Sequence, residues 1–128
     1  MKLTTLGFDA DDTLWENERF FKLTEDRVTE LLVDFADPDR LRERLLAAER
    51  RNLRIYGFGI KGFTLSMVET AIEVTEERVP ARVIEQILAA GREMHAHPVE
   101  TLPNVRETLE RLAPDYRMIL ITKGDLFD

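Results

Sequence analysis

Two short apolar segments lie near opposite ends of this 128-residue chain, and the sequence between them has a helical pattern. Residues 3–8 (LTTLGF) and 116–122 (YRMILIT) are rich in β-branched and apolar side chains, as in buried strands. The second run is nearly continuous, which is typical of a parallel strand covered on both faces. Parallel strands need a long crossover, usually helical, so the arrangement predicts an α/β fold with one large helical connection.

The residues between the two strands predict five helices. Apolar side chains recur there every three or four positions, and several helix ends carry their own signals. We expect no strand longer than three residues within 18–97. The first predicted helix covers about 20–35, and the second begins after an N-cap at Asp37, with Pro38 next, and ends near Tyr56. A glycine-rich break at 57–62 (GFGIKG) precedes the third helix. The fourth begins at Pro80 and ends at His97-Pro98, and a short fifth helix covers 104–112.

Composition excludes several classes of function. The net charge of −7 argues against a nucleic-acid surface and against binding to anionic membranes. The chain has no cysteine, which excludes disulfides and thiolate chemistry and is compatible with a reducing cytoplasm. The longest unbroken apolar run, 118–121, is too short to cross a bilayer. We therefore expect a soluble, cytoplasmic, globular protein without nucleic-acid or membrane partners.

The most informative motif is DADDTL at 9–14, directly after the first predicted strand. Ligands bind where parallel strands end, and carboxylates two residues apart in a tight loop can reach one crevice. One carboxylate can attack phosphorus while the other protonates the leaving oxygen and then activates water. This density of oxygen ligands suits Mg²⁺. A solvated acidic turn remains an alternative, whereas an EF-hand is excluded because its sixth and twelfth positions hold Leu14 and Phe20.

A second candidate site, Thr122-Lys123-Gly124, follows the other predicted strand. A threonine hydroxyl and successive backbone N–H groups in such a turn can hold phosphate oxygens. The tripeptide alone is equally compatible with an ordinary loop, so its position carries the argument. If the two strands are parallel neighbours, Asp9, Asp11 and Thr122 lie close together at one edge of the sheet.

Four other features favour structural interpretations. The G-x-G-x-x-G spacing at 57–62 follows a basic segment instead of a buried strand, so an inter-helix loop is favoured over a dinucleotide site. His95 and His97 suit a helix C-terminus better than a metal site. The arginine-rich stretch 40–54 is interpreted as a solvated helix face. Trp15, next to the acidic loop, is expected to pack where the two parts of the chain join.

The segments FDADDTLW and ILITKGD resemble the first and second motifs of the haloacid dehalogenase (HAD) superfamily. The lead-in LPNVRETLERLAPDYRMILIT is similar to the helix and strand that precede the second motif in that family. The resemblance implies a HAD-like Rossmannoid parallel sheet, of which 1–16 and 99–128 form the N-terminal part of the core. Residues 17–98 would be an α-helical cap inserted after the first motif. The family's third and fourth motifs would follow KGDLFD, so we interpret the chain as truncated after the second motif.

The resemblance also implies residue roles. Asp9 would be the nucleophile and a Mg²⁺ ligand, and Asp11 the general acid/base, with its carbonyl on the metal. Thr122, with Lys123 and Gly124, would bind the phosphoryl group; Lys123 directly follows Thr122 and is not the family's third-motif lysine. The implied function is Mg²⁺-dependent hydrolysis of a small phosphorylated metabolite through an aspartyl-phosphate.

Two other functions remain as alternatives to a phosphohydrolase. Metal-independent dehalogenases of the same superfamily generally lack the second aspartate, so Asp11 favours phosphoryl transfer. A non-catalytic interaction domain derived from a HAD protein is the other alternative. Residues 1–128 alone are expected to be inactive, because the acidic pair and the cation of the later motifs would be missing. They are also expected to self-associate, because the first strand would have an open edge and the apolar run 118–121 would lack part of its cover.

Overall fold

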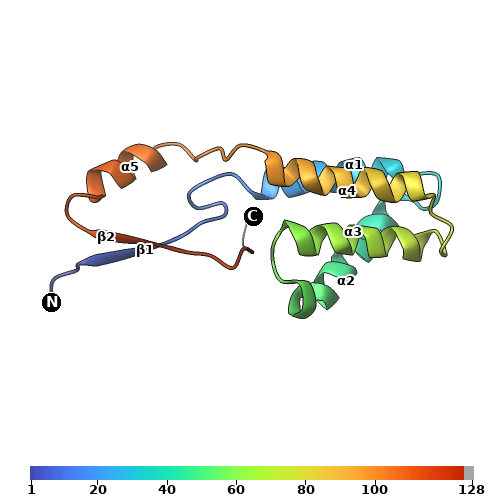
Figure 1. Ribbon diagram of the computed structural model, residues 1–128, viewed down its shortest axis with the longest axis horizontal. Coiled ribbons are helices and arrows are strands. Elements are labelled where there is room, and N and C mark those ends of the chain that lie inside the picture. The colour runs from blue at the N-terminus through green and yellow to red at the C-terminus, as the bar shows by residue number, and fades with distance from the viewer. Residues whose placement is uncertain (126–128) are drawn as a thin grey trace. The chain divides into compact units, whose positions relative to one another are not determined.

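The computed structural model describes residues 1–125, and the elements follow the predicted order of strand, five helices and strand. Residues 18–97 are all described and contain no strand, which confirms the helical prediction. The last three residues of the predicted core segment 99–128 lie outside the described part. The elements are β1 (Thr5–Asp9), α1 (Glu18–Leu31), α2 (Pro38–Tyr56), α3 (Ile60–Val74), α4 (Ala81–Ala96), α5 (Val105–Leu112) and β2 (Arg117–Ile121) (Figure 1).

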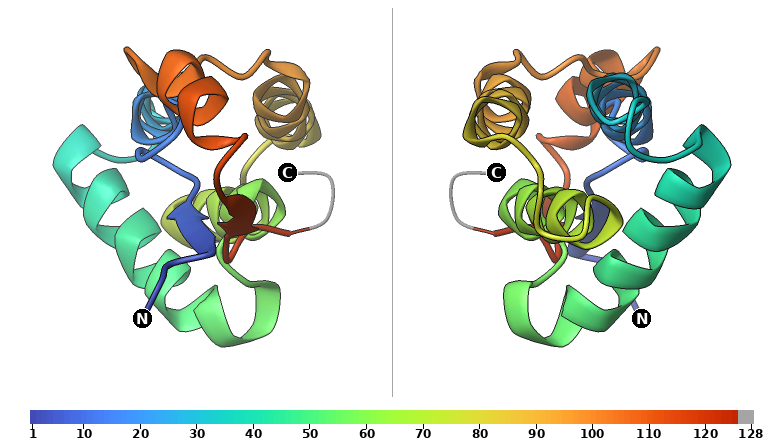
Figure 2. Two further views of the ribbon diagram at one scale, coloured as in Figure 1. Left: turned by 90° about the vertical axis from the view of Figure 1, so that its left-hand side faces the viewer. Right: turned by 90° about the vertical axis from the view of Figure 1, so that its right-hand side faces the viewer.

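The two strands pair in parallel, as predicted. Thr5 lies opposite Arg117 at one end of the ladder, and Asp9 lies opposite Ile121 at the other. The left view of Figure 2 shows the two strand arrows side by side. β1 begins later than the predicted 3–8 and extends through Asp9, so the first acidic residue belongs to the strand itself.

The chain divides into two compact units. The first consists of Met1–Phe20 and Pro98–Thr122, and it contains both strands and α5. The second consists of Phe21–His97 together with 123–125, and it contains α2, α3, α4 and most of α1.

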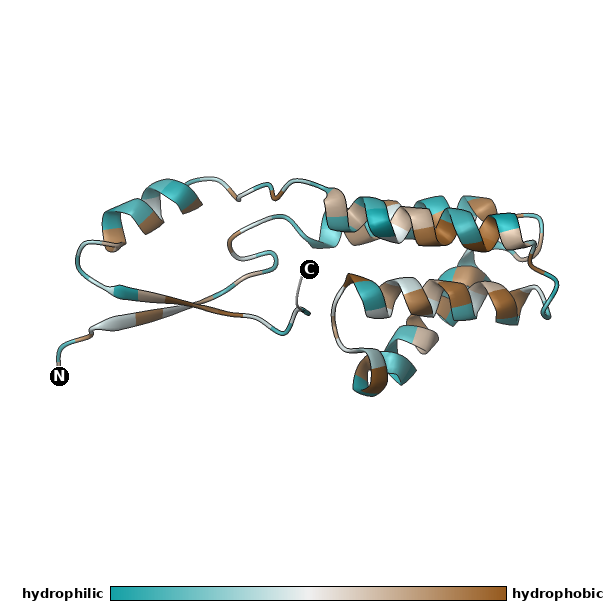
Figure 3. Cartoon of the chain, in the orientation of Figure 1, coloured by the Kyte–Doolittle hydropathy of each residue, from teal (hydrophilic) through white to brown (hydrophobic). Residues whose placement is uncertain are grey.

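The second unit has a continuous apolar core formed by its four helices. Met67 on α3 and Ile87 on α4 have no exposed surface, and the rings of Phe21 and Phe63 lie 4.8 Å apart between centroids. Apolar stripes along these helices can be followed in Figure 3. The buried core residues are Val28, Leu32, Leu41, Leu45, Phe63, Met67, Ala71, Val74, Val83 and Ile87.

The sheet of the first unit is more exposed than predicted. All five residues of β2 are exposed, although a continuous apolar run predicted burial on both faces. Figure 3 shows this apolar strand in brown. The prediction was wrong for this chain because burial on both faces requires a covering layer on each side. In the described residues the sheet has only two strands, and α5 has no buried residue.

Helix boundaries in the second unit follow the predicted signals. Asp37 caps α2: its carboxylate accepts hydrogen bonds from the backbone N–H groups of Asp39 (3.0 Å) and Arg40 (3.3 Å), and Pro38 occupies the first helical position. The α4 helix begins after Pro80 and ends at Ala96, with His97 as its C-cap.

The glycine-rich break is shorter than predicted. It comprises only 57–59, because α3 begins at Ile60 and includes Gly62. A Cβ atom at Gly62 would lie 3.0 Å from the Gly57 carbonyl oxygen, so the glycine permits a close approach between the helix and its own leading turn. The segment is preceded by α2 and not by a strand, so the structural context of a dinucleotide site is not present.

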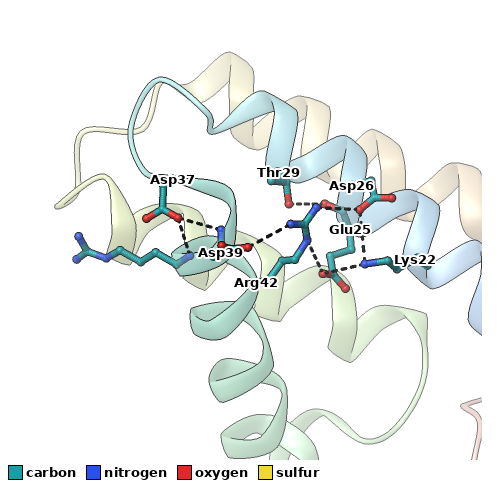
Figure 4. A network of polar contacts seen from close by, with 8 residues as sticks. Lys22, Glu25, Asp26, Thr29, Asp37, Asp39 and Arg42 are labelled. Atoms are coloured by element: carbon teal, nitrogen blue, oxygen red, sulfur yellow. Dashed lines mark hydrogen bonds and ion pairs between the residues drawn. The ribbon is translucent and has the colours of Figure 1, made fainter.

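Arg42 connects α2 to α1 through a network of ion pairs (Figure 4). Its guanidinium lies 3.5 Å from Glu25 Oε1 and 3.3 Å from Asp26 Oδ1, both on α1, and 3.8 Å from Asp39. The other arginines of 40–54 are exposed, as a solvated face predicts, although Arg44 and Arg51 also form ion pairs with Glu73 and Glu69 on α3. Each partly exposed pair contributes little, about 0–1 kcal/mol, so the network adds little to the stability of the helix pair.

Candidate active site

The acidic loop after β1 is anchored by two buried apolar side chains. Ala10 and Leu14 are 1% and 9% exposed, whereas Asp9, Asp11 and Thr13 are exposed. The N–H groups of Thr13 and Leu14 donate to the carbonyl of Ala10, at 3.1 and 2.8 Å, which closes a single helical turn. The loop therefore presents polar side chains from a backbone fixed by its own hydrogen bonds and by burial.

Asp9 and Asp11 each accept a hydrogen bond from the side chain four residues further on. Thr13 Oγ1 donates to Asp9 Oδ2 at 3.0 Å, and Trp15 Nε1 donates to Asp11 Oδ1 at 3.0 Å. From the sequence, Thr13 had no assigned role and Trp15 was expected mainly to pack. The sequence carries no regular spacing signal for these contacts, because Asp9 ends β1 and Asp11 forms an isolated bridge with Trp15 across a turn.

Asp12 has a different task from the two aspartates before it. Its φ of 57° is left-handed, a conformation that Asp and Asn adopt more readily than most residues. From there its Oδ1 accepts from the N–H groups of Asn17 (3.0 Å) and Glu18 (3.1 Å), at the start of α1. Asp12 thus caps α1, where a negative charge also complements the helix dipole.

The far limb of the loop pairs with the segment that follows α4. The N–H of Glu16 donates to the carbonyl of Glu100 at 2.9 Å, and the N–H of Leu102 donates to the carbonyl of Leu14 at 2.9 Å. Trp15 forms an antiparallel bridge with Thr101 between these two bonds. The loop is therefore held at both ends, by β1 on one side and by 100–102 on the other.

The register of the sheet brings two predicted site segments to the same edge. Asp9, the last residue of β1, lies opposite Ile121, and Thr122 is the next residue after β2. Parallel strands end at the same edge, where ligands bind in open α/β sheets. Asp9, Asp11 and Thr122 all belong to the first unit.

Lys123 and Gly124 fall in the second unit. The Lys123 ammonium lies 5.1 Å from the centroid of the Phe58 ring, a cation–π distance. The adjacent Asp125 carboxylate lies 4.0 Å from Lys61 Nζ. The five predicted site residues are thus divided between the units immediately after Thr122.

The oxygen donors in the first unit fit part of a Mg²⁺ site. The exposed carboxylate of Asp9 and the Asp11 carbonyl are hard ligands, and Mg²⁺ commonly keeps several waters beside one or two carboxylates. Within residues 1–125, no three His, Asp or Glu side chains form a group that could hold a metal ion. The described residues therefore supply only a partial coordination sphere.

Glu69 forms the centre of a polar cluster between α2 and α3 that the sequence analysis missed. Its carboxylate accepts from Asn52 Nδ2 (2.7 Å), Tyr56 Oη (2.9 Å) and Arg51 Nη2 (3.1 Å). The hydrogen bond from Asn52 is the main reason that the pKa of Glu69 is lowered, and the bond to Glu69 raises the pKa of Tyr56. The cluster joins two helices at polar positions that a search for apolar periodicity does not detect.

No helix among the described residues is long and apolar enough to cross a membrane. No family model matches the chain, and no curated protein matches it. Solved structures do. A haloacid dehalogenase-like family hydrolase from Xanthomonas campestris is 49% identical, with a TM-score of 0.89 over 98% of this chain and 52% of that one. A predicted phosphoglycolate phosphatase from Haemophilus somnus, 20% identical, shares the fold, with a TM-score of 0.53 over 96% of this chain and 52% of that one.

The chain spans about half the length of both solved structures. The alignment with the Xanthomonas campestris protein covers 98% of the present sequence, and therefore both strands, the acidic loop and the helical segment between them. In sequence and fold, this chain is similar to about half of a haloacid dehalogenase-like family hydrolase.

Proposed function

We propose that the whole protein containing this chain is a Mg²⁺-dependent phosphohydrolase that acts on a small phosphorylated metabolite. The observation that carries the proposal is the pair of exposed carboxylates, Asp9 and Asp11, at the edge of the sheet where Thr122 follows the neighbouring strand. Similarity to a solved haloacid dehalogenase-like family hydrolase supports it. The activity is proposed for the whole protein because the chain spans about half of that relative.

In the first step, Asp9 attacks the phosphorus atom of the bound ester. A carboxylate oxygen forms a bond to phosphorus while the bond from phosphorus to the ester oxygen breaks, which gives an aspartyl-phosphate. The Thr13 hydroxyl holds Oδ2 of Asp9, so Oδ1 is the oxygen we assign to the attack. Asp11, as the acid, transfers its proton to the departing oxygen; the alcohol leaves the active site, and Asp11 remains there as a carboxylate.

In the second step, water releases the phosphate. The Asp11 carboxylate takes a proton from a water molecule as that water attacks phosphorus, and the bond between phosphorus and Asp9 breaks. Asp9 is regenerated as a carboxylate and Asp11 as an acid, so the cycle closes without another reactant. The Thr122 hydroxyl would hold an oxygen of the transferring group through both steps.

The Asp9 carboxylate and the Asp11 carbonyl would hold Mg²⁺. When bound, the ion would offset the negative charges of the carboxylates and the phosphoryl group. Asp9 would therefore serve both as ligand and as nucleophile, with one oxygen for each task.

The test is Asp9→Asn in the whole protein, assayed with p-nitrophenyl phosphate and Mg²⁺. We expect kcat to fall by about 10³-fold or more, because loss of a nucleophile removes the covalent route. The matched control is Asp34→Asn, which makes the same chemical change at an exposed residue beyond α1 and should leave kcat unchanged.

Two results would contradict the proposal. Near-normal hydrolysis by the Asp9→Asn protein would refute the role of the nucleophile. Halide release from a 2-haloacid by a wild-type protein that leaves phosphate esters intact would favour the dehalogenase alternative instead.

A further inference from the structure

The chain has a single tryptophan, Trp15, and its indole is directed at Asp11, the proposed general acid/base. The ring N–H donates to Asp11 Oδ1 at 3.0 Å, and the side chain is half-buried, whereas Asp11 is exposed. The partner of an exposed carboxylate is more often water, which is mobile and can approach from many directions. A ring on a fixed backbone restricts the carboxylate to one orientation.

The backbone at Trp15 is fixed on both sides of the chain. Its carbonyl accepts from the N–H of Asp12 at 2.8 Å, which ties it back to the acidic loop. Its other edge forms the bridge with Thr101. The backbone that carries the indole is therefore held both by the acidic loop and by a segment more than 80 residues away in sequence.

An indole suits this position for a chemical reason. It is a donor only and does not titrate, so it can hold a carboxylate oxygen without competing for the proton that the reaction moves. Occupation of Oδ1 by the indole directs proton transfer to Oδ2. A positional error of about 1 Å in a catalytic group can reduce a rate by about 10²-fold, so such an anchor affects catalysis directly.

We propose that Trp15 is a positioning residue that orients the Asp11 carboxyl for protonation of the leaving group. The inference rests on the function proposed above. It goes further in predicting which substrates depend on Trp15. Esters with a strongly basic leaving oxygen need the proton from Asp11, whereas esters with a weakly basic leaving oxygen depart with little help.

The experiment compares two esters in the whole protein with Mg²⁺. Phenyl phosphate has a basic leaving oxygen, and p-nitrophenyl phosphate has a weakly basic one. The measured quantity is kcat/KM, because it reports the steps up to phosphoryl transfer. The variants are Trp15→Phe and a protein with 3-benzothienylalanine at position 15, which keeps the fused ring but replaces the N–H with sulfur.

We expect kcat/KM for phenyl phosphate to fall by about 10- to 100-fold in both variants. For p-nitrophenyl phosphate the change should stay within about threefold, because proton donation contributes little there. Asp11→Asn should show the same selectivity to a larger extent.

Two results would overturn the inference: an equal fall for both esters in the benzothienylalanine protein, which would indicate that the ring serves packing, or full activity on both. If Trp15→Phe does not fold, the benzothienylalanine protein alone decides. A wild-type protein that hydrolyses neither ester would refute the proposed function and this inference with it. An active wild type with unselective variants would refute only the inference.

Discussion

At the residue scale, the three aspartates of the loop are separated by their hydrogen-bond donors. Asp9 accepts from a hydroxyl and Asp11 from an indole, whereas Asp12 accepts from backbone N–H groups at the start of α1. Like charges in one loop repel, and separate donors offset part of that cost for each carboxylate. The sequence motif shows how many acids are present but not which donor each one meets.

The capping role of Asp12 leads to a stability prediction. Asp12→Ala removes the acceptor and places alanine at a left-handed φ, so we expect the free energy of unfolding to fall by about 1–3 kcal/mol. Asp12→Asn keeps an acceptor and tolerates the same φ, and it should cost about 0.5 kcal/mol or less. Urea denaturation of both variants measures the difference, and equal stabilities for Ala and Asn would show that the cap does not form.

At the scale of elements, helix boundaries were largely predictable because single residues encode them. Asp37 with Pro38 marks the start of α2, and Gly57 with φ 80° marks its end. The glycine-rich break was overestimated because Gly62 serves a close approach inside α3, and spacing does not distinguish a packing glycine from a turn glycine. The apolar run of β2 predicted burial on both faces, but such a run shows what a strand prefers, not which layers are present to cover it; the exposure agrees instead with the expectation that this run lacks part of its cover in residues 1–128.

The contact between α3 and α4 depends on Gly91. A Cβ atom there would lie 2.2 Å from Thr64 Oγ1 and 2.8 Å from Thr64 Cγ2. Helix propensity alone predicts that Gly91→Ala stabilises the protein by about 1 kcal/mol. We expect the overlap to reverse the sign and lower the free energy of unfolding by about 1–2 kcal/mol.

A double-mutant cycle with Thr64→Ala isolates this contact. Alanine at 64 removes both close atoms and leaves Cβ at 3.1 Å, so Gly91→Ala should cost less in that background. If Gly91→Ala raises the free energy of unfolding while Thr64 is present, the close contact between α3 and α4 at Gly91 is contradicted.

The Glu69 cluster predicts a pH dependence of stability. The hydrogen bonds from Asn52, Tyr56 and Arg51 lower the pKa of Glu69 below its ordinary value of 4.5. The native state therefore favours the carboxylate, and its stabilising contribution is present above pH 4.5 and is lost as the pH falls through the lowered pKa. Tyr56 and Arg51 are then paired to a neutral acid.

Urea unfolding between neutral and acidic pH tests this dependence. Glu69→Gln should have a flatter profile than the wild type in the region below pH 4.5, because glutamine does not titrate. The control is Glu110→Gln, an exposed residue paired with Arg106 on α5, which should leave the profile unchanged. Identical profiles for Glu69→Gln and the wild type would contradict the assigned cause.

At the scale of the whole molecule, the proposed chemistry belongs to the unit that contains the sheet. Asp9, Asp11 and Thr122 all belong to that unit, whereas Lys123 and Gly124 fall in the helical one. The two segments of the first unit are about 80 residues apart in sequence. That Asp9 and Thr122 lie at one edge was predictable only on the assumption that the two strands are parallel neighbours, because the carboxyl ends of such strands lie at the same edge of a sheet. Self-association of residues 1–128 and their inactivity alone stay predictions.

The central claim is that Asp9 carries the phosphoryl group, and mass spectrometry of a quenched reaction tests it most directly. In the Asp11→Asn form of the whole protein, loss of the base should slow hydrolysis of the intermediate. With p-nitrophenyl phosphate and Mg²⁺, acid quenching should then yield a phosphoryl adduct on the peptide that contains Asp9, and Asp9→Asn should abolish it. A protein that hydrolyses the ester without an adduct at Asp9, or with one at another residue, would contradict the account.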